Sequence, residues 1–178
     1  MKVIFRLVLA LMSVAFLFKE VPAQVDQSKE NLPVSVKDLR NAPAKIVLDG
    51  KSLSLSTYVG RDFMPGSWGH GGSPLMVGVK VATFDKQAFP SRARIDRIWV
   101  LFEEQIWASD YRGVPLTPSN SNKEGWIYCS NSPVCEASVQ GGPQWRPGVL
   151  VDVVVRLIDK EGKHYLIQAR RQEIKSSV

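Results

Sequence analysis

The chain has 178 residues, of which 44% are hydrophobic and 22% are charged, with a formal net charge of +6 and two cysteines. This length suits a single domain with a substantial core, and the composition excludes a disordered chain, a collagen-like chain and a cysteine-rich miniprotein. We therefore expect one basic globular domain, and the sequence carries no signature of a particular biochemical activity.

The first segment, residues 1–23, is typical of a secretory signal peptide. Two basic residues precede an apolar run of twelve residues, Leu7–Phe18, and small residues stand at Val21 and Ala23, the positions that a signal peptidase reads. The run is too short to cross a bilayer, which needs about 20 residues, so an uncleaved anchor is the less favoured alternative. Cleavage after Ala23 leaves 155 residues with a net charge of +4. We expect an exported protein, periplasmic or secreted, without a transmembrane segment once the signal is removed.

Export changes what the positive charge indicates. A basic domain outside the cytoplasm meets envelope polymers, lipids, glycans and other exported proteins rather than nucleic acid. The expected partners are an envelope or extracellular protein or a glycan, and nucleic acid is not expected.

The next segment, residues 24–44, is polar and shows little hydrophobic periodicity. It contains two prolines, and we expect a flexible lead-in with a short extended piece at 34–36. The ordered β-domain is expected to span residues 45–178.

The first ordered element is expected to be a hairpin. Segments 45–48 and 51–58 flank Asp49-Gly50, a dipeptide that favours the positive φ angles of a type I′ turn. The second segment alternates leucine or threonine with serine, which predicts a strand with one apolar face and one hydroxyl face.

The same period of two predicts the later strands. Strands are expected at 75–84, at 95–102, which is apolar on both faces near its end, and at 105–108. Residues 149–157 and 165–174 flank a charged loop with a glycine, which predicts a long antiparallel hairpin.

These elements amount to about seven strands and no helix of ten or more residues. The expected fold is all-β, a single immunoglobulin-like antiparallel β-sandwich, with a small β-barrel as the alternative. The Cys…Trp…Cys framework of antibody domains is missing, because both cysteines follow Trp99.

Two stretches of the chain are similar to segments of a known group of proteins. Thr57–Gly66 and Gly148–Leu157 resemble segments of small uncharacterised exported bacterial β-sandwich proteins. The resemblance implies export and a β-sandwich over most of the ordered domain, and it implies no activity.

The two cysteines, Cys129 and Cys135, are separated by five residues. In an oxidising compartment they are expected to form a disulfide, and their spacing is neither the C-x2-C redox spacing nor that of a zinc-ligand pair. We interpret them as a local clip on an irregular segment, with a redox-active pair as the alternative.

Candidate binding residues lie on two predicted loops. Gly60–Pro74 is rich in glycine, and Asp110–Pro147 is long and carries the cysteine pair. The candidates are the charged and aromatic side chains Arg61, Asp62, Trp68, His70, Trp126 and Trp145. Structural roles are the alternative, in which the charges bridge neighbouring loops and Trp145 covers one end of the core. A ligand site gains support if the two loops meet at one end of the sandwich.

Two alternatives would add chemistry to these loops. Met64, His70 and Met76 lie within thirteen residues and are soft ligands that suit copper. A hydrolase would draw its acids and bases from Asp62, His70, Glu103, Glu104 and Asp110. However, Pro65–Gly69 misses the G-x-S-x-G elbow of serine hydrolases by one position, and adjacent carboxylates on a strand face apart.

The arginines also form clusters. Those at 92, 94 and 97 and those near the C-terminus are interpreted as solvated or edge-protecting positions, with a polyanion-binding face as the alternative.

The predicted function is that of an exported, non-enzymatic binding or envelope-assembly domain without metal or cofactor. A periplasmic copper-binding protein and a hydrolase with an unrecognised site are the alternatives.

Overall fold

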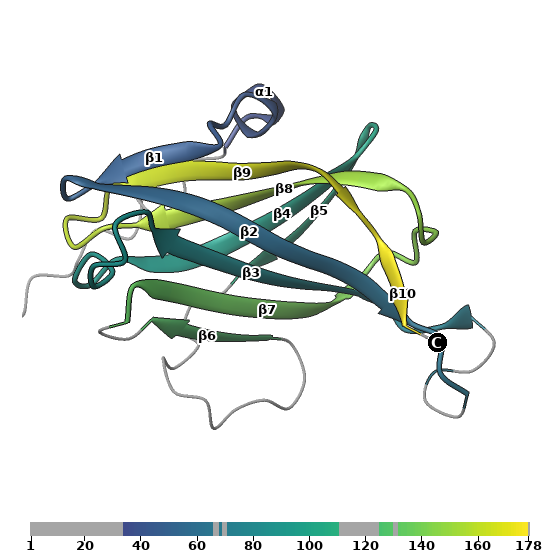
Figure 1. Ribbon diagram of the computed structural model, residues 1–178. Helices are drawn as coiled ribbons and strands as arrows, with labels where there is room; N and C mark the ends of the chain where they lie inside the picture. The colour runs from purple at the N-terminus through teal and green to yellow at the C-terminus, as the bar shows by residue number, and fades with distance from the viewer. Residues whose placement is uncertain (1–33, 66–67, 69–70, 111–124, 130–131, 178) are drawn as a thin grey trace, which may run out of the picture. The chain divides into compact units, whose positions relative to one another are not determined.

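The computed structural model describes residues 34–65, 68, 71–110, 125–129 and 132–177. The predicted signal peptide and residues 24–33 of the predicted lead-in lie outside these ranges. The described chain is all-β, with ten strands in two mainly antiparallel sheets and one short helix (Figure 1). Within these ranges no helix has the length and apolar character needed to cross a bilayer.

The first sheet, sheet A, has the strand order β1-β2-β3-β7-β6. Its strands are β1 (Lys45–Leu48), β2 (Lys51–Asp62), β3 (Leu75–Thr83), β6 (Gly125–Cys129) and β7 (Val134–Gly142). The short strand β10 (Lys175–Ser177) joins this sheet by pairing in parallel with the end of β2.

The second sheet, sheet B, has the order β5-β4-β8-β9 and lies behind sheet A in Figure 1. Its strands are β4 (Arg94–Phe102), β5 (Gln105–Asp110), β8 (Leu150–Ile158) and β9 (His164–Glu173). Because β9 leads into β10, the chain passes from sheet B to sheet A near its C-terminal end.

The strand order is that of an immunoglobulin-type sandwich. With β2 taken as strand A, the sheets read A-B-E-D and C′-C-F-G, and β1 is an additional strand ahead of A. The predicted all-β, immunoglobulin-like sandwich is therefore confirmed. The barrel alternative is excluded for the described residues, because their strands form two sheets rather than one closed sheet.

The period of two in the strands produces the core. Alternate residues of β3 and β8 are almost inaccessible to solvent, and they form one core with buried residues of β2, β4 and β7 between the sheets. The residues on β3 and β8 are Leu75, Val77, Val79, Val81, Val151, Val153, Val155 and Leu157. Burying one such aliphatic side chain contributes about 1.5–3 kcal/mol, so this pattern alone brings the two sheets together.

The predicted type I′ hairpin is confirmed at the start of sheet A. Asp49 and Gly50 have φ angles of 49° and 73°, and β1 pairs with β2 on either side of them. Strand β2 continues to Asp62, beyond its predicted end at residue 58, because β3 and β10 both pair with its last residues. Gly60, Arg61 and Asp62 therefore belong to a strand, and the predicted loop that begins at residue 60 starts later.

The predicted loop Asp110–Pro147 is corrected in its second half, which holds β6 and β7. The buried positions of β7 are Cys135, Ala137 and Val139. These side chains are small, and prolines and glycines flank them, so the alternation of apolar and polar residues predicts a strand only weakly. The sequence therefore read as a loop.

The cysteines close the β6–β7 hairpin. Cys129 lies directly opposite Cys135, with their Cα atoms 4.2 Å apart, and the two form a disulfide. The predicted local clip is confirmed, although it links two paired strands rather than an irregular segment.

A second apolar cluster lies on the outer face of sheet B. The helix α1 (Val36–Arg40) is capped by the Ser35 hydroxyl, which accepts a hydrogen bond of 3.1 Å from the Asp38 N–H. The extended piece predicted at 34–36 is thus the cap and first turn of a helix. Residues from this segment and from the sheet pack together in the cluster, namely Leu39, Ala42, Trp99, Leu101 and Val154.

Sheet B also contains a buried ion pair. Arg156 on β8 donates to Asp96 on β4 through two hydrogen bonds of 2.8 and 2.5 Å, and both side chains are 2% exposed. The register of β4 against β8 shifts between Ile95 and Arg97, at the position of Asp96. The Arg156 guanidinium lies 5.7 Å from the Trp99 ring centre, so the pair adjoins the second apolar cluster.

Removing the charge of Asp96 is expected to destabilise the fold. Asp96→Asn should lower the free energy of unfolding by about 3 kcal/mol, because it leaves a buried arginine without its counter-charge. Denaturant unfolding followed by circular dichroism measures the change. The double variant Asp96→Leu with Arg156→Met should lose less than the single variant, and a larger loss would contradict this explanation.

Breaking the disulfide is expected to have a limited effect. Replacing both Cys129 and Cys135 by serine should lower the free energy of unfolding by about 2 kcal/mol, because the closed loop is short. The melting transition of this variant should stay cooperative, and adding reductant to the native protein should give the same result. Global unfolding on reduction would show that the bond is not a local clip.

Candidate functional site

The two predicted binding loops meet at one end of the sandwich, where Arg61 joins them. Alternation along β2 directs Arg61 inward, after Val59, and its side chain is 4% exposed. Its guanidinium donates to four backbone carbonyls, those of Gly71 (2.5 Å), Ser73 (2.7 Å), Gln144 (3.2 Å) and Trp145 (3.1 Å). The first two belong to the first loop and the last two to the second.

The environment of Arg61 identifies it as a structural anchor. Within the described part of the chain its partners are carbonyl oxygens rather than a carboxylate, and its Cζ lies 4.9 Å from the centre of the Phe63 ring. Burial lowers the pKa of Arg61, but a guanidinium is so strongly basic that it stays charged at neutral pH. The Arg61 guanidinium is engaged by the backbone carbonyls of the two loops, so little of its surface is open to a ligand.

Asp62 has a comparable role. Its Oδ1 accepts from the Met64 N–H (2.9 Å) and from the Ser177 hydroxyl (3.2 Å). Its backbone N–H donates to the Ser73 hydroxyl at 2.7 Å. Asp62 therefore ties the end of β2 to the first loop and to β10, as the bridging alternative for this residue describes.

Trp145 covers this end of the core. Its side chain is 8% exposed, its ring centre lies 5.3 Å from that of Phe102, and its Nε1 donates to the Gln105 side chain at 2.8 Å. It is a member of the main hydrophobic cluster. The structural alternative, in which Trp145 covers one end of the core, therefore describes its position. The Trp145 side chain has little surface left for a ligand.

The remaining candidates divide into three cases. Trp68 is 49% exposed and is available for contact. His70 lies outside the described residues. The side chain of Trp126 also lies outside them, although its backbone pairs with Ser138 in β6–β7. The loops thus meet as predicted, but the described candidates that they bring together are mostly engaged in packing and hydrogen bonds.

The copper alternative stays a prediction, because His70 falls outside the described ranges. Met64 is half-exposed and Met76 is half-buried on β3. Among the residues that the structure describes, no three His, Cys, Asp or Glu side chains gather in a way that could hold a metal ion.

The carboxylates named for the hydrolase alternative are dispersed. Glu103 and Glu104 form the tight turn between β4 and β5, where Glu103 has a φ of 50°. Glu104 is exposed and lies 3.6 Å from an Arg40 nitrogen. The Asp110 side chain lies outside the described residues, and Asp62 is engaged as given above.

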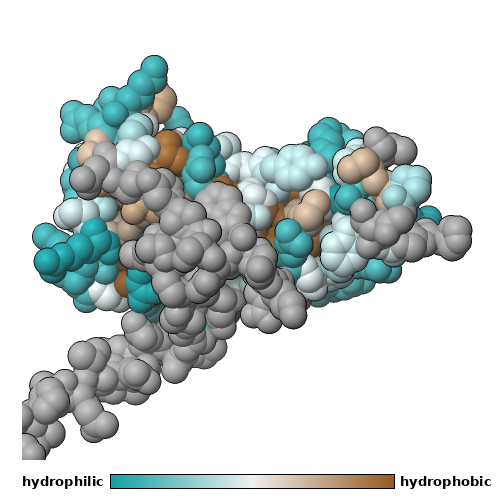
Figure 2. Space-filling model, turned by 90° about the horizontal axis from the view of Figure 1, so that it is seen from below, coloured by the Kyte–Doolittle hydropathy of each residue, from teal (hydrophilic) through white to brown (hydrophobic). Residues whose placement is uncertain are grey.

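Exposed hydrophobic side chains lead to a different surface, the outer face of sheet A. Val47 pairs with Ser52, and Phe84 donates its N–H to the Ser52 carbonyl, so both lie beside the hydroxyl face of β2. Val47, Tyr58 and Phe84 are 65%, 51% and 74% exposed. On the side of the molecule seen in Figure 2, hydrophobic areas are small and lie among hydrophilic residues.

A groove of about 330 Å³ crosses this face between β2, β3 and β7. We call it the Tyr58 groove. Its lining includes Ser56, Tyr58, Gly78, Lys80 and Glu136. The sequence predicted the hydroxyl face of β2 but not the groove. The pattern that indicates it is that Tyr58 and Gly60 share the face of the serines, with Gly78 opposite Tyr58.

The glycines decide how Tyr58 lies. Gly78 is its direct partner on β3, and Gly60 lies two residues further along β2. A Cβ atom at Gly60 would stand 2.6 Å from the Tyr58 hydroxyl and 2.8 Å from its Cζ. The tip of the ring therefore lies against the backbone at Gly60, and the Tyr58 side chain stays about half exposed.

Polar groups line the same groove on the side of Tyr58 away from Gly60. The Lys80 Nζ lies 3.1 Å from Glu136 Oε1, and both side chains are partly exposed. The Ser56 hydroxyl is 3.4 Å from the Lys80 carbonyl oxygen. The groove thus combines an aromatic side chain with an ammonium donor, a carboxylate acceptor and a hydroxyl.

No protein-family model matches the chain, and no curated protein is significantly similar to it. The chemistry of these surfaces therefore carries the functional argument.

Replacing Arg61 is expected to open the end of the sandwich. Arg61→Met should lower the free energy of unfolding by about 3 kcal/mol, because it leaves four carbonyls without their donor. Arg61→Lys keeps the charge but lacks the planar fork that reaches both loops, so it should recover less than half of that loss.

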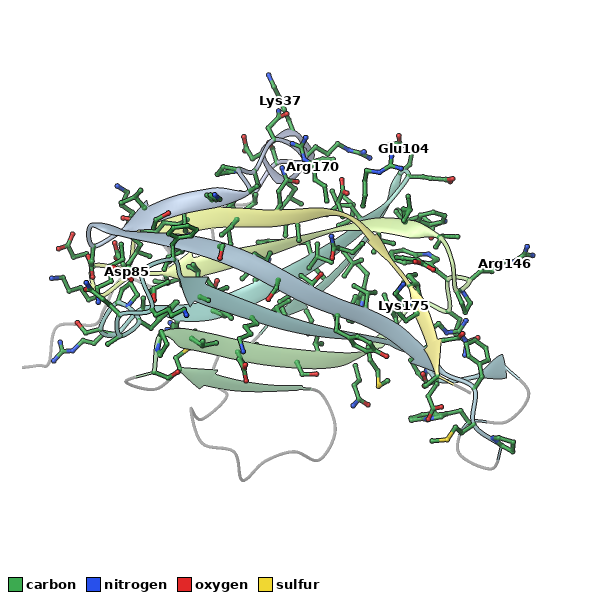
Figure 3. All side chains as sticks on the ribbon, in the orientation of Figure 1. Lys37, Asp85, Glu104, Arg146, Arg170 and Lys175 are labelled. Carbon is green, nitrogen blue, oxygen red and sulfur yellow. A yellow bond between two sulfur atoms is a disulfide. The ribbon has the colours of Figure 1, made fainter. Side chains whose placement is uncertain are left out.

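Urea unfolding measures both Arg61 variants, and Arg146→Met is the matched control. Arg146 is exposed at the same end of the sandwich (Figure 3), so its replacement should change stability by less than about 0.5 kcal/mol. If Arg61→Met behaved like this control, the anchor role would be wrong.

Proposed function

We propose that this chain is an exported, non-enzymatic binding domain that holds a glycan in the Tyr58 groove. The observation that carries the proposal is the half-exposed Tyr58 side chain, which lines the same groove as the Lys80–Glu136 pair. The predicted signal peptide and the disulfide support export to an oxidising compartment.

The chemistry of a sugar matches this arrangement. A pyranose ring has an apolar face of C–H bonds and a rim of hydroxyl groups. An aromatic ring face is a flat apolar surface with partial negative charge, which attracts those C–H bonds. The Lys80 ammonium donates to sugar hydroxyls, and the Glu136 carboxylate accepts from them.

The groove is suited to binding rather than cleavage. Glycoside hydrolysis requires two carboxyl groups that flank the bond, about 5–10 Å apart. Within the described lining, Glu136 is the carboxylate, and it is paired with Lys80 at 3.1 Å. One aromatic ring and one pair of polar groups support weak binding per site, with a Kd on the order of 1 mM.

An envelope-assembly role is the second candidate, and one observation favours it. Phe84 and Val47 are strongly exposed near each other on the same face, and the Lys45 Nζ lies 5.5 Å from the Phe84 ring centre. Aromatic side chains with such exposure are common contacts between proteins. This pair lies outside the lining of the Tyr58 groove, so the two roles can be separated by mutation.

The test is a titration of the full protein with oligosaccharides, followed by NMR chemical shifts and calorimetry. Hexasaccharides of β-1,4-linked glucose and of β-1,4-linked N-acetylglucosamine serve as probes. Binding of either should shift backbone signals of β2, β3 and β7. Tyr58→Ala should weaken binding at least tenfold, whereas Tyr58→Phe should stay within about threefold, because it keeps the ring face.

Phe84→Ala is the matched control, since it removes an exposed aromatic side chain from the same face but outside the groove. Its glycan affinity should be unchanged. Glycan binding that survives Tyr58→Ala, or no binding of either probe at 10 mM (about ten times the expected Kd), would overturn the proposal.

A further inference from the structure

We infer that the opposite end of the sandwich holds a binding site for an anionic amphiphile, a ligand with an anionic head and an apolar chain. A cavity of about 730 Å³ opens there between the β1–β2 turn, residues 88–94 and the end of β6. Asp85 marks this end in Figure 3, far from Arg146 and Lys175 at the Arg61 end. The volume lies within the range of about 300–1,000 Å³ typical of small-molecule sites.

The floor of this cavity is apolar. Phe89 and Ala93 are 6% and 4% exposed and belong to the main hydrophobic cluster, and Cys129 packs against that cluster. Pro90 is also buried and lines the cavity. These buried residues form the base of the cavity, and the apolar surface open to a ligand above them comes from Ala88, which is exposed, and Cys129, which is half-buried.

The rim of the cavity is positively charged. Among the described residues that line it, Lys51, Arg92 and Arg94 are cationic and Asp49 is a carboxylate. Cations therefore outnumber carboxylates in the described lining of this hollow. A cleft lined mainly by one sign of charge concentrates ligands of the opposite sign.

The segment that forms the wall is fixed before a ligand arrives. The Phe89 N–H donates to the Ser132 carbonyl at 2.9 Å, and the Lys51 ammonium donates to the Ala88 carbonyl. The Thr83 hydroxyl donates to the Gln87 carbonyl at 2.6 Å. Because these bonds join the wall to β2, β3 and the β6–β7 turn, binding needs little ordering of the backbone.

The conformation of Arg92 is a further indication. Its φ is 63°, in the left-handed region that residues with a Cβ atom occupy at a cost. Glycine would be the favoured residue for the backbone alone, yet an arginine stands there on the rim of the cavity. From the sequence, Arg92 is interpreted as a solvated or edge-protecting residue. The structure shows that it lines the same cavity as Lys51 and the apolar floor.

These observations define the ligand by its chemistry. The cationic rim selects a carboxylate or phosphate head, and the apolar floor selects an apolar chain. The site uses other residues than the Tyr58 groove, so it stands or falls independently of glycan binding.

Three probes separate the parts of this chemistry. Octanoate carries both head and chain, acetate carries the head alone, and octyl glucoside below its micelle concentration carries the chain without charge. We expect octanoate to bind the full protein at least tenfold more tightly than either of the others. Its backbone NMR shifts should centre on residues 88–94, and its affinity should fall as salt is raised.

Arg92→Gly is the decisive variant, because it removes a rim charge while suiting the positive φ, so it should fold at least as well. It should weaken octanoate binding at least fivefold, and Lys51→Met should do the same. Arg146→Gln, at the other end, is the control and should bind normally. Octanoate affinity that is unchanged in Arg92→Gly and Lys51→Met, acetate or octyl glucoside binding equal to that of octanoate, or shifts centred elsewhere would each overturn the inference.

Discussion

The guanidinium of Arg61 is the interaction on which one end of this sandwich depends. It lies on the inward face of β2 and donates to carbonyls that precede β3 and to carbonyls that follow β7. An arginine suits this place because its planar group carries five N–H donors in a fixed geometry. The segment after β7 then carries the chain to β8 in the other sheet, with Trp145 over the core. The Arg61 side chain thus fixes the segment that passes from sheet A to sheet B and holds Trp145 over the core.

The sandwich was predictable because strand alternation is a local property of the sequence. A period of two with large aliphatic residues, as in β3, fixes which face is buried without reference to any partner strand. The same reasoning missed β7, whose inward residues are small and adjoin Pro133 and Pro143. It also left the role of Arg61 open, since the acceptors are backbone carbonyls up to 84 residues away and no side-chain pattern encodes them.

The two proposed sites were hidden from the sequence for a related reason. The position of the Tyr58 side chain depends on Gly78, which lies opposite it, and on Gly60, against which the tip of its ring lies, and the first of these depends on the register of β2 against β3. The end cavity likewise joins a turn, a loop and a strand end that lie far apart in the chain. Composition predicted a basic domain, and the signal-peptide pattern of residues 1–23 predicted export. Register and connectivity then concentrate part of that charge around an apolar hollow and leave an aromatic ring open on a polar face.

The parallel pairing of β10 with β2 gives this fold a direction of mechanical resistance. Lys175–Ser177 lie beside Gly60–Asp62, and the Phe63 N–H donates to the Ser177 carbonyl at 3.0 Å. In a parallel pair, a pull on the far ends of the two strands acts along them and loads all of their hydrogen bonds together. The neighbouring Ile174, fully buried, resists the same displacement through packing. A tether attached beyond β10 would therefore transmit tension first into the end of the sandwich that Arg61 closes.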